Sequence, residues 1–218
     1  MEHSFWLDRW QKGEIGFHRD AYHASLEAHW PNLNVPAGSD VFVPLCGKSL
    51  DMQWLALRGH RVIGAELSEV AIDAFFESQE LSPETRRDGE FIVKSAGPYE
   101  LWCGDIFELP RSALKNTAAV YDRASLVAFD PGAQLRYANW LMKTLSGAPI
   151  LLVSLDFDQS EMSGPPFSIP EAKLQELFTE GFIVERLSRT DALALNDPLR
   201  KRGLTHLVET VHVLRNTT

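Results

Sequence analysis

Apolar runs of strand length alternate with segments of helical period along most of the chain after residue 40. This alternation is typical of α/β proteins, in which helices cover both faces of a mostly parallel sheet. The expected helices are 49–58, 68–80, 131–145 and 170–179. The expected strands are 41–45, 61–66, 91–94, 100–103, 118–122, 149–155, 182–188 and 206–214.

The two ends of the chain depart from this alternation. Residues 5–30 predict two short helices, the second capped by Asp20, before the strands begin. Only a short segment separates the last two strands, so they predict an antiparallel hairpin at one end of the sheet. That segment holds the densest basic cluster, residues 200–202, which is typical of a solvated loop. The length of 218 residues predicts a single domain over residues 1–218.

The overall charge and the cysteine count argue against several classes of protein. A net charge of -9 repels phosphate backbones, so we expect no nucleic-acid partner. The 2 cysteines form no disulfide framework and suit a reducing compartment, so we expect a cytoplasmic protein. No apolar run is long enough to span a membrane, and the N-terminus carries no secretion signal. We expect a monomer that acts on a small molecule.

The turn after the first strand, residues 44–49, contains Gly-Lys-Ser without forming a phosphate-binding loop. Such a loop needs another glycine five residues before Gly47, and Phe42 stands there, inside the strand. A dinucleotide fingerprint is also incomplete, because Gly47 is the one glycine in this turn. However, Glu66 ends the second strand 19 residues after Gly47, where a carboxylate binds ribose hydroxyls. The pattern favours a ribose-containing cofactor without a pyrophosphate, such as S-adenosylmethionine.

Cys46 lies in the same turn and raises the alternative of a reactive thiol. A nucleophilic cysteine needs a histidine partner or a helix N-terminus that lowers its pKa. A helix is expected to begin near Cys46, but no histidine is close to it in sequence. The pattern favours a small residue packed in a tight turn.

Five motifs, in order along the chain, resemble the thiopurine S-methyltransferase family and its bacterial branch in particular. The aromatic stretch 5–18 is similar to the family's Trp-x-x-x-Trp…Gly-Phe-His segment, and 43–68 is similar to its cofactor segment. Residues 102–110, 121–131 and 164–170 are similar to three further segments. Together the motifs span nearly the whole chain.

The resemblance implies a class I methyltransferase fold, which is Rossmann-like. Its sheet would have seven strands in the order 3-2-1-4-5-7-6, with strand 7 antiparallel and helices on both faces. The implied reaction is S-adenosylmethionine-dependent S-methylation of aromatic or heterocyclic thiols, such as thiopurines, by direct displacement on the sulfonium methyl, with S-adenosylhomocysteine as product. Residues 1–35 would form a helical lid, and residues 40–218 the α/β core.

The same resemblance implies a set of cofactor-binding residues. Glu66 is expected to bind both ribose hydroxyls, and Arg123 can bind the methionine carboxylate through two parallel hydrogen bonds. Trp10 can attract the cationic sulfonium, although aromatic residues at helical spacing also pack in cores. Asp105 can bind the adenine amino group or cap the loop that it begins, and Arg123 can instead pair with Asp122 or Asp105. The set comprises Trp10, Leu45, Glu66, Asp105, Ile106 and Arg123.

The acceptor-binding residues are expected in two places. Phe17 matches an acceptor-contacting position of the family and can stack on a flat heterocycle. In the segment after strand 149–155, Pro166 and Phe167 can line a wall, and Asp156 can touch a purine nitrogen. We expect no catalytic general base, because a thiol that ionises near neutral pH needs none. We also expect no metal, because acidic and histidine residues do not cluster at ligand spacing.

Two other functions remain open. The first is methylation of selenium or tellurium compounds for detoxification, for which Lys12, Arg19 and Lys48 would attract an oxyanion. The second is a non-catalytic sensor that binds the cofactor or a metabolite. The N-terminal helices and Glu66 favour turnover over sensing, and the single glycine of the turn disfavours a nicotinamide dehydrogenase.

Overall fold

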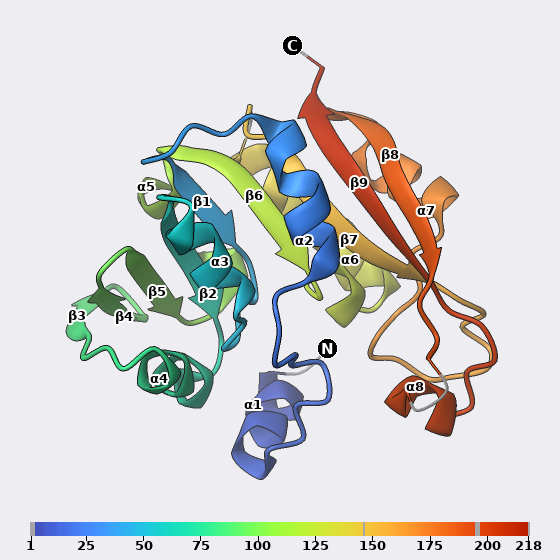
Figure 1. The fold of residues 1–218 in the computed structure, drawn as a ribbon, viewed down its shortest axis with the longest axis horizontal. Helices are drawn as coiled ribbons and strands as arrows, with labels where there is room; N and C mark the ends of the chain where they lie inside the picture. The colour runs from blue at the N-terminus through green and yellow to red at the C-terminus, as the bar shows by residue number, and fades with distance from the viewer. Residues whose placement is uncertain (1–2, 146, 195–196, 218) are drawn as a thin grey trace. The chain divides into compact units, whose positions relative to one another are not determined.

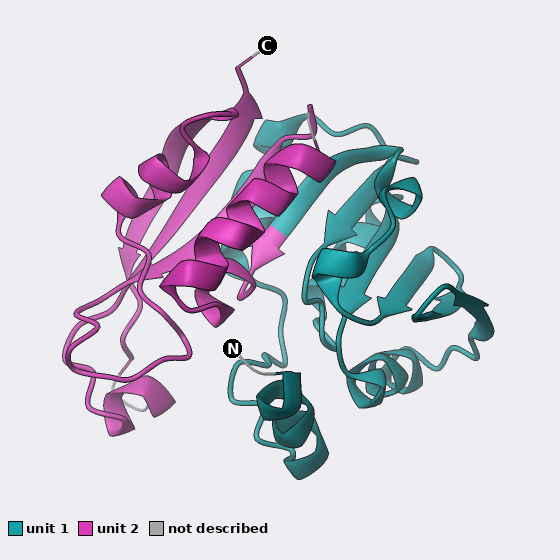
Figure 2. Ribbon diagram, turned by 180° about the vertical axis from the view of Figure 1, so that it is seen from behind, with its two compact units in different colours: residues 1–121 teal, residues 122–218 magenta. Residues whose placement is uncertain are grey.

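The computed structural model describes residues 3–145, 147–194 and 197–217. The chain forms two compact units, Met1–Tyr121 (unit 1) and Asp122–Thr218 (unit 2), which Figure 2 shows in teal and magenta. Each unit combines strands with helices (Figure 1), as the alternating sequence pattern predicts.

Unit 1 contains a sheet with a parallel part and an antiparallel part. Its strands are β1 (Asp40–Val43), β2 (Arg61–Glu66), β3 (Glu84–Asp88), β4 (Phe91–Ala96), β5 (Tyr99–Cys103) and β6 (Thr117–Arg123), the last of which ends in unit 2. The order is β3-β4-β5-β2-β1-β6. β2 pairs in parallel with β1 and β5, β1 pairs in parallel with β6, and β4 pairs antiparallel with β3 and β5.

The seven strands that the family resemblance implies are too few, because the described residues form nine. The hairpin of β3 and β4 is additional to the parallel strands of unit 1. No strand was expected at Glu84–Asp88, because four of its five residues, ETRRD, are charged and all are exposed. Backbone pairing with β4 holds this strand. Its side chains are not buried, so its sequence shows no apolar alternation from which a strand could be predicted.

The helices of unit 1 lie in the connections between strands and before β1. The core lies where α3 and α4 pack against β2. There Phe42, Trp54, Ile63 and Phe75 are each at most 1% exposed, and burying a side chain of this size stabilises the fold by about 1.5–3 kcal/mol. The helices are α1 (His3–Lys12), α2 (Ala24–His29), η1 (Trp30–Leu33), α3 (Asp51–Leu57), α4 (Glu69–Ser78), η2 (Ile106–Glu108) and α5 (Arg111–Leu114).

The second N-terminal helix begins later than the sequence suggested. Asp20 does not cap it; α2 has His23 as its N-cap, whose ring Nδ1 accepts a hydrogen bond from the Ser25 N–H at 3.3 Å. His23 itself is fixed by Asp51, since its N–H donates to Asp51 Oδ1 at 2.8 Å. His23 and Asp51 are 28 positions apart in sequence. A local capping rule does not detect a contact of this kind.

Unit 2 contains three further strands, β7 (Ile150–Asp156), β8 (Phe182–Asp191) and β9 (Val208–Asn216). β9 lies between the other two and is antiparallel to both, so the antiparallel terminal hairpin is confirmed. Asp130 caps α6 by accepting from the N–H groups of Gly132 and Ala133. The helices of unit 2 are η3 (Leu126–Ala128), α6 (Pro131–Thr144), α7 (Glu171–Phe178) and α8 (Pro198–Lys201).

His212, in β9, makes the stability of the fold depend on pH. Its side chain is buried, and neither ring nitrogen has a hydrogen-bond partner among the described residues. Burial lowers the pKa of His212 from 6.5 to about 4. Between these values the unfolded chain binds the proton and the folded chain does not, so the free energy of unfolding falls as pH falls from about 6.5 to 4.

We expect His212→Leu to remove this acid-dependent loss. The variant should also gain about 1 kcal/mol at pH 7, because it no longer buries unpaired polar nitrogens. Relative to wild type, the gain should rise by about 2 kcal/mol between pH 7 and pH 4. Urea unfolding at both pH values measures it, with the exposed His206→Gln as the control. An equal difference at both pH values would contradict the explanation.

Candidate functional site

The turn between β1 and α3 has a backbone shape that few sequences adopt. Leu45 and Gly47 both have positive φ, 44° and 51°. The turn lies against the end of β2, because the Cys46 N–H donates to the Ala65 carbonyl at 3.0 Å. A side chain at Gly64 would lie 2.7 Å from Cys46 Sγ, so a glycine in β2 permits this close approach.

Glu66 lies at the end of β2 and holds the turn through its carboxylate. Its Oε2 accepts from the Gly47 N–H at 2.9 Å, and its Oε1 accepts from the Ser68 N–H at 2.8 Å. The residue is 7% exposed. Burial raises the pKa of Glu66, and the backbone hydrogen bonds from Ser68, Gly47 and Leu67 oppose that rise by favouring the carboxylate. Each oxygen keeps further lone pairs, so the carboxylate can still accept from two hydroxyls.

The end of β5 is joined to the same place by a backbone hydrogen bond. The Gly104 N–H donates to the Glu66 carbonyl at 2.9 Å. A Cβ at Gly104 would lie 2.6 Å from the Phe91 ring, so only glycine fits there without rearrangement. Asp105 follows and begins η2, where its Oδ1 accepts from the Phe107 N–H at 2.9 Å and its Oδ2 lies 3.4 Å from His3 Nε2. Asp105 therefore does cap a loop, and Ile106 beside it is buried.

An aromatic cluster of Trp6, Trp10 and Phe17 lies over the turn. Trp10 is 8% exposed and its ring faces Gly47, where a Cβ would come within 3.0 Å of Trp10 Cζ2. The Phe17 ring meets those of Trp10 and Trp6 edge to face, at centroid distances of 5.7 and 5.8 Å. Phe17 is 37% exposed. Unit 1 thus brings Trp10, Leu45 and Glu66 together around one turn.

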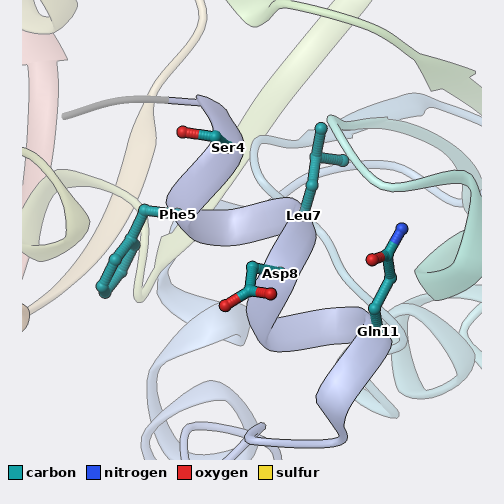
Figure 3. A pocket seen from close by; sticks show the side chains of 5 residues that line it. All are labelled: Ser4, Phe5, Leu7, Asp8 and Gln11. Atoms are coloured by element: carbon teal, nitrogen blue, oxygen red, sulfur yellow. The ribbon is translucent and has the colours of Figure 1, made fainter.

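A hollow on α1 lies beside the aromatic cluster, since the Phe5 ring in its lining meets the Trp6 ring edge to face at a centroid distance of 5.2 Å. Figure 3 shows the five side chains that line it, all from this one helix: Ser4, Phe5, Leu7, Asp8 and Gln11. None of them is among the predicted site residues. The hollow therefore adds no support for the predicted site residues.

Arg123 lies in unit 2, at the end of β6, on a turn held by a buried carboxylate. The Asp122 Oδ2 accepts from Tyr137 Oη–H at 2.7 Å, and Oδ1 accepts from the Leu126 N–H at 3.4 Å. Burial raises the pKa of Asp122 to about 6. The next residue, Ala124, has a positive φ of 65°. This network fixes the backbone that carries Arg123. In the sequence, the motif Tyr-Asp-Arg at residues 121–123 is the feature that indicates Arg123.

The other predicted acceptor residues also lie in unit 2, on and after β7. Asp156 is the last residue of β7, and it is half-buried, as are Pro166 and Phe167. The Phe167 N–H donates to the Val127 carbonyl at 2.7 Å. Its ring packs on Gly164, where a Cβ would come within 2.5 Å of the ring. The Phe167 backbone is therefore fixed by a hydrogen bond, and its ring packs against the backbone at Gly164.

The described residues also bear on other kinds of site. They contain no group of three or more His, Cys, Asp or Glu side chains placed to hold a metal ion. No helix in the described part of the chain is both long enough and apolar enough to cross a membrane.

Comparison with known proteins shows what the chain is similar to. The family model for thiopurine S-methyltransferase matches residues 1–217. Thiopurine S-methyltransferase of Pseudomonas fluorescens (strain Pf0-1) is 44% identical over 215 residues, which are 99% of this chain and 99% of that protein. The enzyme of the same name from Methylococcus capsulatus is 44% identical over 217 residues, 99% of this chain and 98% of that protein.

A solved structure has the same fold at low sequence identity. It is the Burkholderia thailandensis 1,6-didemethyltoxoflavin-N1-methyltransferase with bound 1,6-didemethyltoxoflavin and S-adenosylhomocysteine. The TM-score is 0.63 at 18% identity, over 99% of this chain and 87% of that one. This likeness shows the Rossmann-like α/β fold of class I methyltransferases. The match to the family model and the 44% identity to its members show that the chain belongs to the thiopurine S-methyltransferase family, and that it is an S-adenosylmethionine-dependent methyltransferase.

Proposed function

We propose that this chain methylates the sulfur of aromatic and heterocyclic thiols, thiopurines among them. The names of its relatives support the substrate class. The observation that carries the proposal is the buried Glu66 carboxylate, fixed by the N–H groups of Gly47 and Ser68 beside a turn with a single glycine. This arrangement suits a ribose and leaves little access for a pyrophosphate.

The residues of the cofactor site fit S-adenosylmethionine. Glu66 would bind the ribose hydroxyls with its remaining lone pairs, and the Leu45 backbone lies in the turn that Glu66 holds. Trp10 would place an aromatic ring near the cationic sulfonium. Asp105 and Ile106 would hold the adenine, and Arg123 the methionine carboxylate. When bound, the cofactor supplies an electrophilic methyl group that a thiolate can take by direct displacement.

The acceptor would be held by aromatic and rigid apolar groups. Phe17 and Phe167 can each present a ring to a flat heterocycle. Pro166 would stiffen the wall beside Phe167, and Asp156 would accept a hydrogen bond from a ring N–H. The chain itself needs to orient the acceptor and exclude water, because the nucleophile is already a thiolate.

Cys46 takes no part in this reaction. It is 4% exposed, and burial raises the pKa of its thiol well above 9.0, so it stays protonated at neutral pH. We expect Cys46→Ala to keep kcat/KM within about threefold of wild type and to lose about 1 kcal/mol of stability to the small cavity. The half-buried Cys103→Ala is the control. A loss of activity of about 100-fold or more at unchanged cofactor affinity would restore Cys46 as a nucleophile.

Methylation of selenium or tellurium oxyanions is the alternative reaction. It needs cations near the acceptor. Lys12 Nζ is held by Asp8 Oδ2 at 2.6 Å, which leaves Arg19 and Lys48 as the candidates. Thiol methylation is preferred because the relatives at 44% identity are thiopurine S-methyltransferases. We also propose a cytoplasmic monomer that acts without metal, nucleic acid or membrane.

An acceptor panel tests the proposed function. Initial rates with 6-mercaptopurine, thiophenol, selenite and tellurite are compared at one saturating S-adenosylmethionine concentration. We expect kcat/KM for the aromatic thiols to exceed those for the oxyanions by at least about 100-fold. The opposite ranking would establish the detoxifying reaction. Cofactor binding without transfer to any acceptor would indicate a sensor.

A further inference from the structure

The basic cluster at residues 200–202 is more than a solvated loop. The guanidinium of Arg202 donates two hydrogen bonds from separate nitrogens: Nη1 to the Pro165 carbonyl and Nη2 to the Ser163 carbonyl, both at 2.8 Å. These two carbonyls flank Gly164 in the chain. A planar guanidinium reaches two acceptors at once, which a lysine ammonium cannot match in geometry.

A second set of contacts ties the same two segments. The Glu161 carboxylate accepts from the Thr205 N–H at 2.8 Å and from Thr205 Oγ1 at 2.6 Å. Gly203, with φ of 112°, allows the close approach, since a Cβ there would lie 3.1 Å from the Glu161 carbonyl oxygen. Apolar packing accompanies these bonds, in a buried cluster of Phe157, Met162, Leu204 and Leu207.

Arg202 binds the same backbone segment, residues 163–165, against which the Phe167 ring packs. The Phe167 ring packs on Gly164, between the two carbonyls that the guanidinium binds. In addition, the Phe167 N–H is bonded to the Val127 carbonyl. If the guanidinium is removed, the carbonyls on both sides of Gly164 lose their donor, and the backbone under the ring loses one of the sets of contacts that hold it.

We propose that Arg202 is a positioning residue that sets acceptor specificity by fixing the Phe167 wall. The proposal rests on the proposed function, in which Phe167 contacts the thiol acceptor. Arg202 itself touches no reactant, and its role is to favour flat ring systems over small thiols. Without Arg202, the Phe167 ring can take several positions. The kcat/KM for a well-fitted bicyclic acceptor then falls relative to that for a small thiol.

The test measures kcat/KM with 6-mercaptopurine and with 2-mercaptoethanol in wild type, Arg202→Ala, Arg202→Lys and Lys201→Ala. For Arg202→Ala we expect the ratio of the two values to fall about 10-fold, mainly because KM rises for the bicyclic thiol. S-Adenosylmethionine affinity should change less than about twofold, and Arg202→Lys should lie between wild type and alanine. Lys201→Ala removes the same charge from the neighbouring exposed position and should behave as wild type.

The outcomes separate the positioning role from the function on which it rests. A ratio in Arg202→Ala equal to that of wild type and Lys201→Ala overturns the inference and leaves thiol methylation intact. An equal loss with both acceptors, together with weakened cofactor binding, also overturns it, since that is a general structural defect. A wild-type chain that methylates neither thiol overturns the proposed function, and the inference with it.

Discussion

Glu66→Ala is expected to weaken S-adenosylmethionine binding by at least about 100-fold, the largest effect of any single substitution considered. The change removes the proposed ribose acceptor and also leaves the buried N–H groups of Gly47 and Ser68 without their partner. Each buried donor left unpaired costs about 1–3 kcal/mol, so the free energy of unfolding should fall as well. Isothermal titration with S-adenosylmethionine, at a temperature where both proteins are folded, measures the affinity.

Two further variants separate charge from shape at this position. Glu66→Gln keeps one acceptor oxygen but turns an amide N–H₂ toward a backbone donor, so we expect a loss of about 10-fold or more. Glu77→Ala, on the exposed face of α4, removes a carboxylate nearby in sequence and should leave the affinity unchanged. Binding by Glu66→Ala at wild-type affinity would mean that the cofactor does not use this carboxylate.

Gly47→Val is expected to damage both stability and cofactor binding. At φ of 51° a β-branched residue is strained, and its Cβ would lie 3.0 Å from Trp10 Cζ2. Strain and overpacking together should cost about 3 kcal/mol of unfolding free energy. Because the Gly47 N–H bonds Glu66, the displaced turn should also weaken S-adenosylmethionine binding by about 10-fold or more.

Gly97→Val is the matched control for that prediction. Gly97 has a similar φ of 55°, but a Cβ there meets nothing within 4 Å. It should show the backbone strain alone, about 1–2 kcal/mol, with unchanged cofactor affinity. Denaturant unfolding and titration of both variants give the two quantities. Equal losses at the two positions would show that the contact with Trp10 is unimportant.

The sequence is most informative where a local rule is sufficient. β1, β2 and β7 are mostly apolar, so their existence could be predicted, and so could the position of Glu66 at the end of β2. Its role as a ribose acceptor stays a prediction. Pro131 predicts the start of α6, which the structure confirms. The antiparallel hairpin of β8 and β9 follows from a connection too short for a crossover helix.

Contacts between distant residues are what the sequence hides. β3 is an exposed charged strand held by its pairing with β4, and α2 has His23 as its N-cap, whose N–H donates to the distant Asp51. The Arg202 contacts join residues 37 and 39 positions apart, and nothing in three consecutive basic residues indicates which of them binds carbonyls. The partners of Glu66 within the turn also required the fold, although its place at a strand end did not.

The decisive measurement is transfer of an isotopically labelled methyl group from S-adenosylmethionine to 6-mercaptopurine, with the product identified by mass and by NMR. Thiol methylation predicts one S-methyl product for each cofactor consumed. It also predicts a rate that follows the acceptor's own thiolate fraction as pH is changed, because no enzyme base is required. Cofactor binding without a labelled S-methyl product would contradict thiol methylation. A rate governed by one pKa for acceptors of different acidity would show that the chain supplies a base after all.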